Sequence, residues 1–97
     1  MKYVLILFTL TLSLLAKDIG SVLYSSCKFC HGSKAEVKYM NEIQSLKDMT
    51  ALELESKLIS YKKGELDIYG YGSIMKMQMK NIPNGKISQL ASYIEKL

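Results

Sequence analysis

Cys27-Lys28-Phe29-Cys30-His31 contains both cysteines and the single histidine of this 97-residue chain. Two thiols at i and i+3 lie on one side of a helical turn, where both can add to the two vinyl groups along one edge of a porphyrin. A histidine directly after the second thiol is then held beneath the ring, where its imidazole can bind the iron. The spacing is the C-x-x-C-H attachment pattern of c-type haem. It predicts one covalently bound haem c, anchored by Cys27 and Cys30 and ligated by His31.

Other uses of the same cysteine spacing suit this chain less well. A disulfide between the two cysteines would close a loop of very few residues and restrain the unfolded chain only weakly. A zinc site needs a fourth ligand, and the sequence has no further cysteine or histidine. A thioredoxin-like dithiol site belongs to a fold of alternating strands and helices, and no convincing strand pattern is present. The dithiol redox site remains an alternative to haem attachment.

The first sixteen residues differ from the rest of the chain. Met1 and Lys2 precede a largely apolar run over residues 3–15, which is followed by Ala16. This pattern is typical of a secretory signal peptide, and a run of thirteen residues is shorter than the roughly 20 that span a bilayer. We therefore predict a signal peptide over residues 1–16, cleaved near Ala16, and one exported periplasmic domain over residues 17–97 with no permanent membrane span.

The charge of the chain points away from nucleic acid. The formal net charge is +4, and every basic residue is a lysine. These lysines are scattered from Lys17 to Lys96 without a basic run, and no arginine is available to bind phosphates or bases. The pattern favours a solvated surface of mixed charge.

Three helical segments are predicted in the domain. The first begins near Asp18, a suitable N-cap, and continues through residue 26 into the cysteine segment. The second begins at the capping box Thr50-Ala51-Leu52-Glu53 and stops at Gly64. The third follows Pro83 and Asn84. Apolar side chains recur at helical spacing in the last two segments: Leu54, Leu58 and Tyr61, then Ile87, Leu90, Ala91, Ile94 and Leu97.

Two further stretches lie between the second and third helices. Residues 64–73 are rich in glycine and tyrosine, which suits either a chain that bends around a flat ligand or a flexible surface loop. Residues 74–80 carry Met75, Met77 and Met79, which are candidates for the sixth iron ligand. The more distant Met40 and Met49 are expected in the core.

These features together resemble a known family. Gly20 and Tyr24 in the first helix, the C-x-x-C-H segment followed by Gly32, and a methionine upstream of a C-terminal helix containing residues 90–94 resemble the small bacterial class I monohaem cytochromes c. The resemblance implies an all-α fold of three main helices and short helical segments wrapped around one covalent haem. It also implies that the first and last helices cross closely at Gly20, with Tyr24 packed near Leu90 and Tyr93.

The resemblance further implies that a methionine sulfur is the second axial ligand of the iron. In these proteins the ligand commonly stands seven residues before a hydrophobic position that leads into the last helix, and counting back from Ile82 gives Met75. Met77 and Met79 remain alternatives. The family's proline after the haem segment is missing here, so the carbonyl that would orient His31 is sought in residues 43–46. The last helix also lacks the acidic first turn usual in the family.

The predicted function is one-electron transport rather than catalysis. The family resemblance implies a bacterial respiratory chain in which a quinol-oxidising complex is the electron donor and a terminal oxidase or peroxidase is the acceptor. We also expect the protein to be a monomer. Four lysines either steer an acidic partner or are merely solvated: Lys28, Lys34, Lys76 and Lys80.

Two other functions remain as alternatives. A haem enzyme or ligand sensor would have an open iron site, without a methionine ligand. A copper(I)-handling protein would use Met75, Met77 and Met79 together as thioether ligands.

Overall fold

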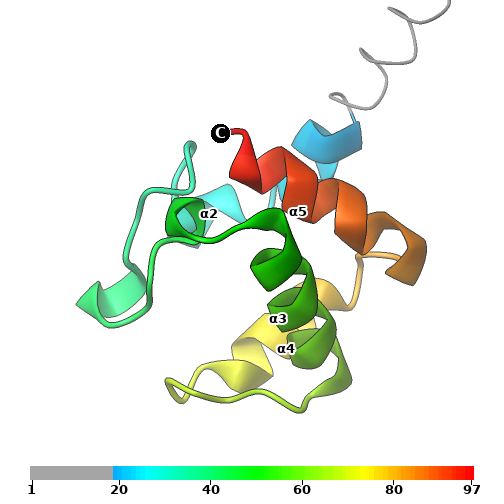
Figure 1. Ribbon diagram of the computed structural model, residues 1–97. Helices are drawn as coiled ribbons and strands as arrows, with labels where there is room; N and C mark the ends of the chain where they lie inside the picture. The colour runs from blue at the N-terminus through cyan, green and yellow to red at the C-terminus, as the bar shows by residue number, and fades with distance from the viewer. Residues whose placement is uncertain (1–18) are drawn as a thin grey trace, which may run out of the picture.

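The computed structural model describes residues 19–97, which form helices and turns with no strand among them (Figure 1). The all-α architecture predicted from the sequence is confirmed. A helical stretch over residues 19–24 is followed by four α-helices: α2 (Lys28–His31), α3 (Ala51–Lys63), α4 (Gly72–Met79) and α5 (Ile87–Glu95). Short 3₁₀ helices cover Tyr39–Asn41, Leu46–Asp48 and Asn84–Lys86.

The signal peptide predicted over residues 1–16 and the N-cap predicted at Asp18 lie outside the described residues. Within residues 19–97, no helix is both long enough and apolar enough to cross a membrane.

The ends of α3 are those that the sequence predicts. The Thr50 side-chain oxygen accepts a hydrogen bond from the Glu53 amide at 3.2 Å, and Gly64 ends the helix in the left-handed conformation with φ 76°. A second contact at the start of the helix comes from far along the chain. The Ala51 amide donates to the Glu95 carboxylate at 2.5 Å, which ties the beginning of α3 to the end of α5.

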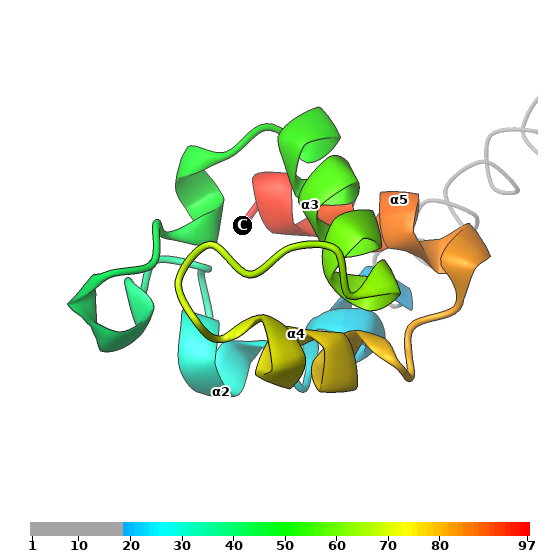
Figure 2. The ribbon, with the colours of Figure 1, turned by 90° about the horizontal axis from the view of Figure 1, so that it is seen from below.

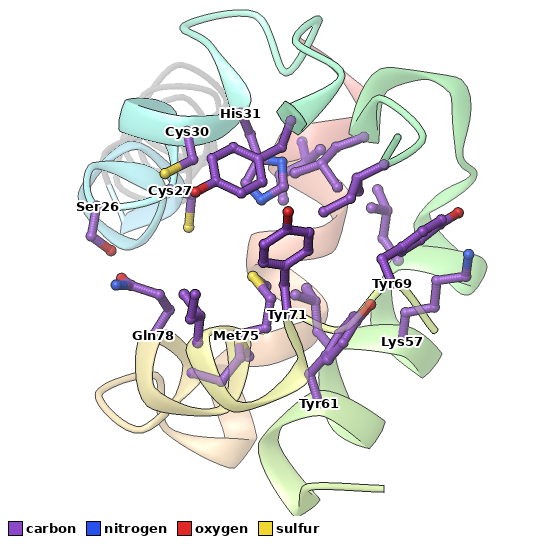
Figure 3. Close-up of a pocket in the computed structure, with 18 of the residues that line it drawn as sticks. Ser26, Cys27, Cys30, His31, Lys57, Tyr61, Tyr69, Tyr71, Met75 and Gln78 are labelled. Atoms are coloured by element: carbon purple, nitrogen blue, oxygen red, sulfur yellow. The ribbon is translucent and has the colours of Figure 1, made fainter. Parts of the chain in front are cut away.

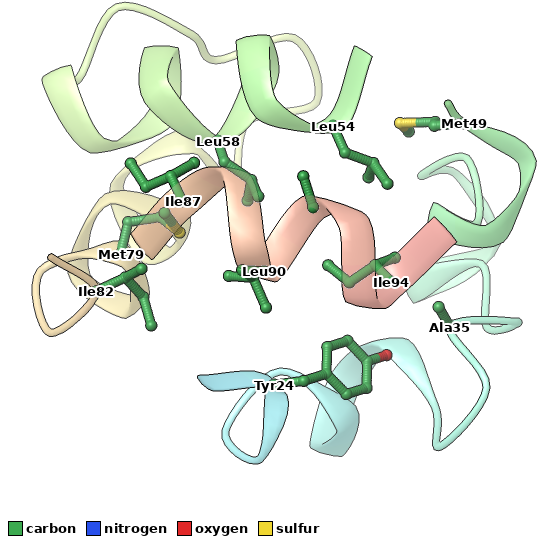
Figure 4. Close-up of a cluster of buried hydrophobic side chains, with 11 residues drawn as sticks. Tyr24, Ala35, Met49, Leu54, Leu58, Met79, Ile82, Ile87, Leu90 and Ile94 are labelled. Atoms are coloured by element: carbon green, nitrogen blue, oxygen red, sulfur yellow. The ribbon is translucent and has the colours of Figure 1, made fainter. Parts of the chain in front are cut away.

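Helix α5 lies at the centre of the hydrophobic core. It packs between α3 on one side and residues 19–24 on the other (Figure 4). The buried side chains of these three segments are Tyr24, Leu54, Leu58, Ile87, Leu90, Ala91 and Ile94. The predicted apolar stripe of the last helix is therefore confirmed, except that Leu97 lies beyond the end of α5 and is 37% exposed.

The first and last helices cross at very short range, as the family resemblance implies. A Cβ atom at Gly20 would lie only 2.7–2.8 Å from the side chain of Tyr93. The Tyr24 and Tyr93 rings pack at a tilt of 48°, with their centroids 5.9 Å apart. Only glycine at position 20 allows the two backbones to approach this closely.

The sequence predicts one continuous helix that extends into the cysteine segment, but the structure has two separate helices there. It ends at Tyr24, residues 25–27 form a turn, and a separate short helix, α2, carries Cys30 and His31. Ser25 explains part of the break, because its hydroxyl donates to the Val22 carbonyl at 2.7 Å. Serine side chains that bond the local backbone compete with helical hydrogen bonding.

The prediction that Met40 belongs to the core is wrong. Its side chain is 62% exposed, and its backbone has φ 56° within the tight turn over Tyr39–Asn41. A residue in such a surface turn projects its side chain into solvent rather than toward the packed helices. Met49, for which the same was expected, is buried.

Gly20→Ala tests the helix crossing. The added methyl group would overlap Tyr93, and because overpacking costs about 1–3 kcal/mol while alanine regains up to about 1 kcal/mol of helix propensity, we expect a net loss of about 1–2 kcal/mol of unfolding free energy. Urea denaturation followed by far-UV circular dichroism measures the change. Gly85→Ala is the control, since a Cβ there meets nothing within 4 Å. Equal stability of the two variants would contradict the close crossing.

Tyr24→Phe tests the hydrogen bond that joins the first helix to the turn after α2. The Tyr24 hydroxyl donates to the Gly32 carbonyl at 2.6 Å, and burial, the largest cause, raises the pKa of Tyr24 from 10.0 to about 12. Because the folded state holds this proton more tightly than the unfolded state, the stabilisation is complete below pH 10 and is lost as the pH rises toward 12.

We therefore expect Tyr24→Phe to lower the unfolding free energy at pH 7 by about 1 kcal/mol and to flatten its decline between pH 10 and 12. Chemical denaturation at several pH values measures both effects. Tyr93→Phe is the matched control, because the Tyr93 hydroxyl makes no hydrogen bond within residues 19–97. A decline of unchanged steepness in Tyr24→Phe would show that Tyr24 does not titrate as expected.

Candidate haem-binding site

A cavity lies between α2, α3 and α4, with a volume of about 1210 Å³ that includes the open space at its mouth (Figure 3). Cys27, Cys30 and His31 line it from one side, and Met75 and Met79 line it from α4. The structure thus brings the cysteines, the histidine and two of the three candidate methionines of the sequence analysis to the same cavity.

The two cysteines are free thiols at the cavity wall (Figure 3). Both are partly buried, and the Cys27 thiol makes a weak contact with the Leu23 carbonyl at 3.9 Å. Burial raises the pKa of Cys27, which keeps this group in its neutral thiol form. Two unpaired thiols on neighbouring turns are available to form thioether bonds at one edge of a flat ring.

Hydrogen bonds to neighbouring backbone groups fix the backbone of His31 on both sides. The His31 amide donates to the Cys27 carbonyl at 3.0 Å, and the His31 carbonyl accepts from the Val37 amide at 3.0 Å. His31 is 8% exposed, and burial lowers the pKa of its imidazole. A neutral imidazole is the form that binds metals.

No carbonyl of residues 43–46 accepts a hydrogen bond from the His31 imidazole, contrary to the expectation from the sequence. Nδ1 of His31 is buried and has no hydrogen-bond partner within residues 19–97. Ile43 and Leu46 instead contribute to the cavity wall. This chain has no proline near the haem segment to fix the direction of a carbonyl there, and its only proline is Pro83.

The three candidate methionines face in different directions because they lie on a helix. Met75 and Met79 are four residues apart and share the side of α4 that faces the cavity, whereas Met77 is 70% exposed and does not line it. Met79 is also a core residue with 2% exposure, while Met75 is only partly buried. Met75 and His31 come from opposite sides of the cavity (Figure 3).

This arrangement removes the basis for a three-methionine copper site, since the thioethers of Met75, Met77 and Met79 do not converge. Within residues 19–97, no group of three or more histidine, cysteine or acidic side chains is placed to hold a metal ion. The described residues also lack the strands of a thioredoxin-like fold.

The sequence did not predict helix α4. Apolar and polar residues alternate over residues 75–79, and this pattern does not have the helical period of 3.6. The helix forms because it packs against α3, so tertiary contacts override the local pattern.

Sequence reasoning also missed part of the cavity wall. Lys57 and four tyrosines complete it: Tyr39, Tyr61, Tyr69 and Tyr71. Lys57 and Tyr61 lie on the same face of α3 as Leu54 and Leu58, so helical spacing was the available signal. Tyr69 and Tyr71 belong to the glycine- and tyrosine-rich stretch, and the ring of Tyr71 meets that of Tyr39 edge to face at 5.5 Å. Because Tyr69 and Tyr71 line the cavity, this stretch fits a chain that bends around a flat ligand better than a flexible surface loop.

The residues present fit a haem. The cavity is lined largely by apolar and aromatic side chains, as a porphyrin requires. Two free thiols stand at its wall, and a buried imidazole without a partner at Nδ1 lies beside them. A thioether reaches the cavity from the opposite side.

Two known proteins to which the chain is similar carry the same name. The chain is 33% identical over 85 residues to cytochrome c-553 of Helicobacter pylori strain 26695, a match that covers 88% of this chain and 83% of that protein. It is 31% identical over 84 residues to cytochrome c-553 of strain J99, covering 87% and 82% of the two chains. No family model matches the sequence, and no solved structure matches it.

The similarity extends over nearly the whole chain and agrees with both the all-α fold and the C-x-x-C-H segment at the cavity. The chain therefore belongs to the small class I monohaem cytochromes c, which are electron carriers with one covalently bound haem c and not enzymes.

Proposed function

We propose that this cytochrome is a periplasmic one-electron carrier of a respiratory chain, with its haem iron ligated by His31 and Met75. The observation that supports the ligation is that the two side chains enter the cavity from opposite sides, His31 from α2 and Met75 from α4, next to the thiols of Cys27 and Cys30 (Figure 3). When bound, the haem supplies an iron that alternates between the ferrous and ferric states.

The protein side chains control access to that iron and its potential. If His31 and Met75 both hold the iron, no position would be left for oxygen or another substrate, as electron transport without catalysis requires. A methionine ligand raises the reduction potential relative to a second histidine. The apolar wall of the cavity, with Leu54, Leu58 and Ile94, lowers the local dielectric and also tunes the potential.

The assignment to a respiratory chain rests on family resemblance and on charge. A quinol-oxidising complex would supply the electron, and a terminal oxidase or peroxidase would accept it. Lys28, Lys34, Lys76 and Lys80 are all exposed, and they would steer an acidic partner surface toward the protein. Export through a signal peptide over residues 1–16 would deliver the domain of residues 17–97 to the periplasm, where we expect it to act as a monomer.

N-terminal sequencing of the haem-containing protein from a periplasmic extract tests the export proposal. We expect the mature chain to begin at or near Lys17, because the apolar run before it is typical of a cleaved signal peptide. A haem protein that retains Met1 and sediments with the membrane would contradict cleavage.

Met75→Ala tests the ligand assignment. The ferric protein should show the weak absorption band of iron–methionine coordination near the red end of the spectrum, and the variant should lose it. Loss of the thioether should also lower the reduction potential. Met77→Ala is the matched control, because Met77 lies on the same helix but is exposed and outside the cavity.

Retention of the band in Met75→Ala would move the ligand to Met79, the other methionine of α4 at the cavity. Absence of the band from the unaltered protein would instead favour the open iron site of an enzyme or sensor.

A further inference from the structure

We propose that Asp67 is a positioning residue for the iron ligand: by holding the first turn of α4, it keeps the Met75 thioether in the cavity. This inference rests on the proposed ligation of the iron by Met75. It concerns a side chain that lies outside the cavity wall and eight residues before the ligand.

The contact that carries the inference is a hydrogen bond across a short loop. The Gly72 amide, at the first residue of α4, donates to Asp67 Oδ1 at 2.8 Å. Amides in the first turn of a helix have no partner within the helix. A carboxylate at this position both accepts the hydrogen bond and places negative charge at the positive end of the helix dipole.

No other side chain in the described structure performs this role for α4. Tyr71, at the N-cap position, makes no side-chain hydrogen bond to the helix, and the first turn contains no acidic residue. Asp67 therefore replaces the usual capping residue from a position further upstream in the chain.

The backbone around Gly72 brings the Gly72 amide close to the Asp67 carboxylate. A Cβ atom at Gly72 would lie 2.5 Å from the Leu66 carbonyl oxygen and 2.9 Å from Asp67 Oδ1, so only glycine fits. Gly70, with φ 83°, supplies the left-handed turn between them. The loop over residues 66–72 is thus closed by both the hydrogen bond and the close approach of the backbone.

Met75 lies less than one turn from this anchor. Its own amide donates to the Tyr71 carbonyl at 3.1 Å, so the backbone of the ligand is bonded directly to the residue next to Gly72. Helix α4 has eight residues, and a helix of two turns is unstable without outside contacts. The direction of the Met75 side chain therefore depends on how the first turn is held.

The same loop contributes to the cavity. Tyr69 and Tyr71 lie between Asp67 and Gly72 in the sequence, and both line the cavity wall. Opening the bond between Asp67 and Gly72 would release these rings together with the first turn of α4. We therefore expect the thioether to leave the iron before the remaining helices unfold.

The experiment compares Asp67→Ala, Asp67→Asn and Glu65→Ala as haem-loaded proteins. Glu65→Ala removes the same charge directly before this loop, but the Glu65 side chain makes no hydrogen bond within residues 19–97. Each protein is titrated with urea while the near-red ferric band and the far-UV circular dichroism are recorded in parallel. Amide hydrogen exchange over residues 72–75 provides a readout that does not depend on the haem.

In Asp67→Ala we expect the band to disappear at a lower urea concentration than the helical signal, and amides 72–75 to exchange about tenfold faster, as for loss of a helix cap. Asp67→Asn keeps an acceptor oxygen without the charge and should fall between wild type and Asp67→Ala. Glu65→Ala should match wild type. If Asp67→Ala yields no haem protein, Asp67→Asn against Glu65→Gln gives the same comparison with a smaller shift of the same sign.

Two results would overturn the inference. Coincident loss of the band and the helical signal in Asp67→Ala, as in Glu65→Ala, would show that Asp67 does not position the ligand. Faster exchange with an unchanged band would show that Asp67 caps the helix without holding Met75. Failure of the ligand assignment itself is distinguishable, because Met75→Ala would then retain the band or the unaltered protein would lack it.

Discussion

The close crossing of α5 over residues 19–24 is the constraint on which the rest of the structure depends. Gly20 lets the two helices approach until the Tyr93 side chain meets the backbone. The haem segment follows this first helix after a turn of three residues, so the crossing also determines where Cys27 and His31 lie. Helix α3 packs against the other face of α5 and forms one wall of the cavity. The core is thus built around α5, and the cavity occupies the space between α2, α3 and α4.

The groups that meet in the cavity are almost all uncharged. Burial lowers the pKa of His31 and so favours its neutral imidazole, the methionine thioether has no charge, and Lys57 is the only lysine in the wall that the structure describes. A neutral, largely apolar surround would favour the ferrous state of a bound haem iron, because that state has the lower net charge. The burial that stabilises the fold would then also favour the reduced form of the carrier.

Where the sequence carried strong local signals, its predictions hold. The capping box at Thr50, the stop at Gly64 and the apolar stripe of the last helix each depend on short-range chemistry, and each is present. Helix α4 was missed because it depends on packing against α3 rather than on hydrophobic period. Met40 was misplaced because apolar character alone does not reveal a left-handed turn. The motif alone predicts Cys27 and Cys30 as attachment points and His31 as a ligand, and all three line the cavity, but only the helical geometry separates Met75 from Met77.

The order in which the chain is made has a consequence for how it folds. The hydrogen bond between Ala51 and Glu95 joins residues 44 positions apart, and the helix that fills the centre of the core follows all the other described helices in the chain. An N-terminal fragment that ends before α5 has no surface on which to bury Leu54, Leu58 or Tyr24. The core therefore forms only once α5 is available, and the described helices should then assemble in one cooperative step.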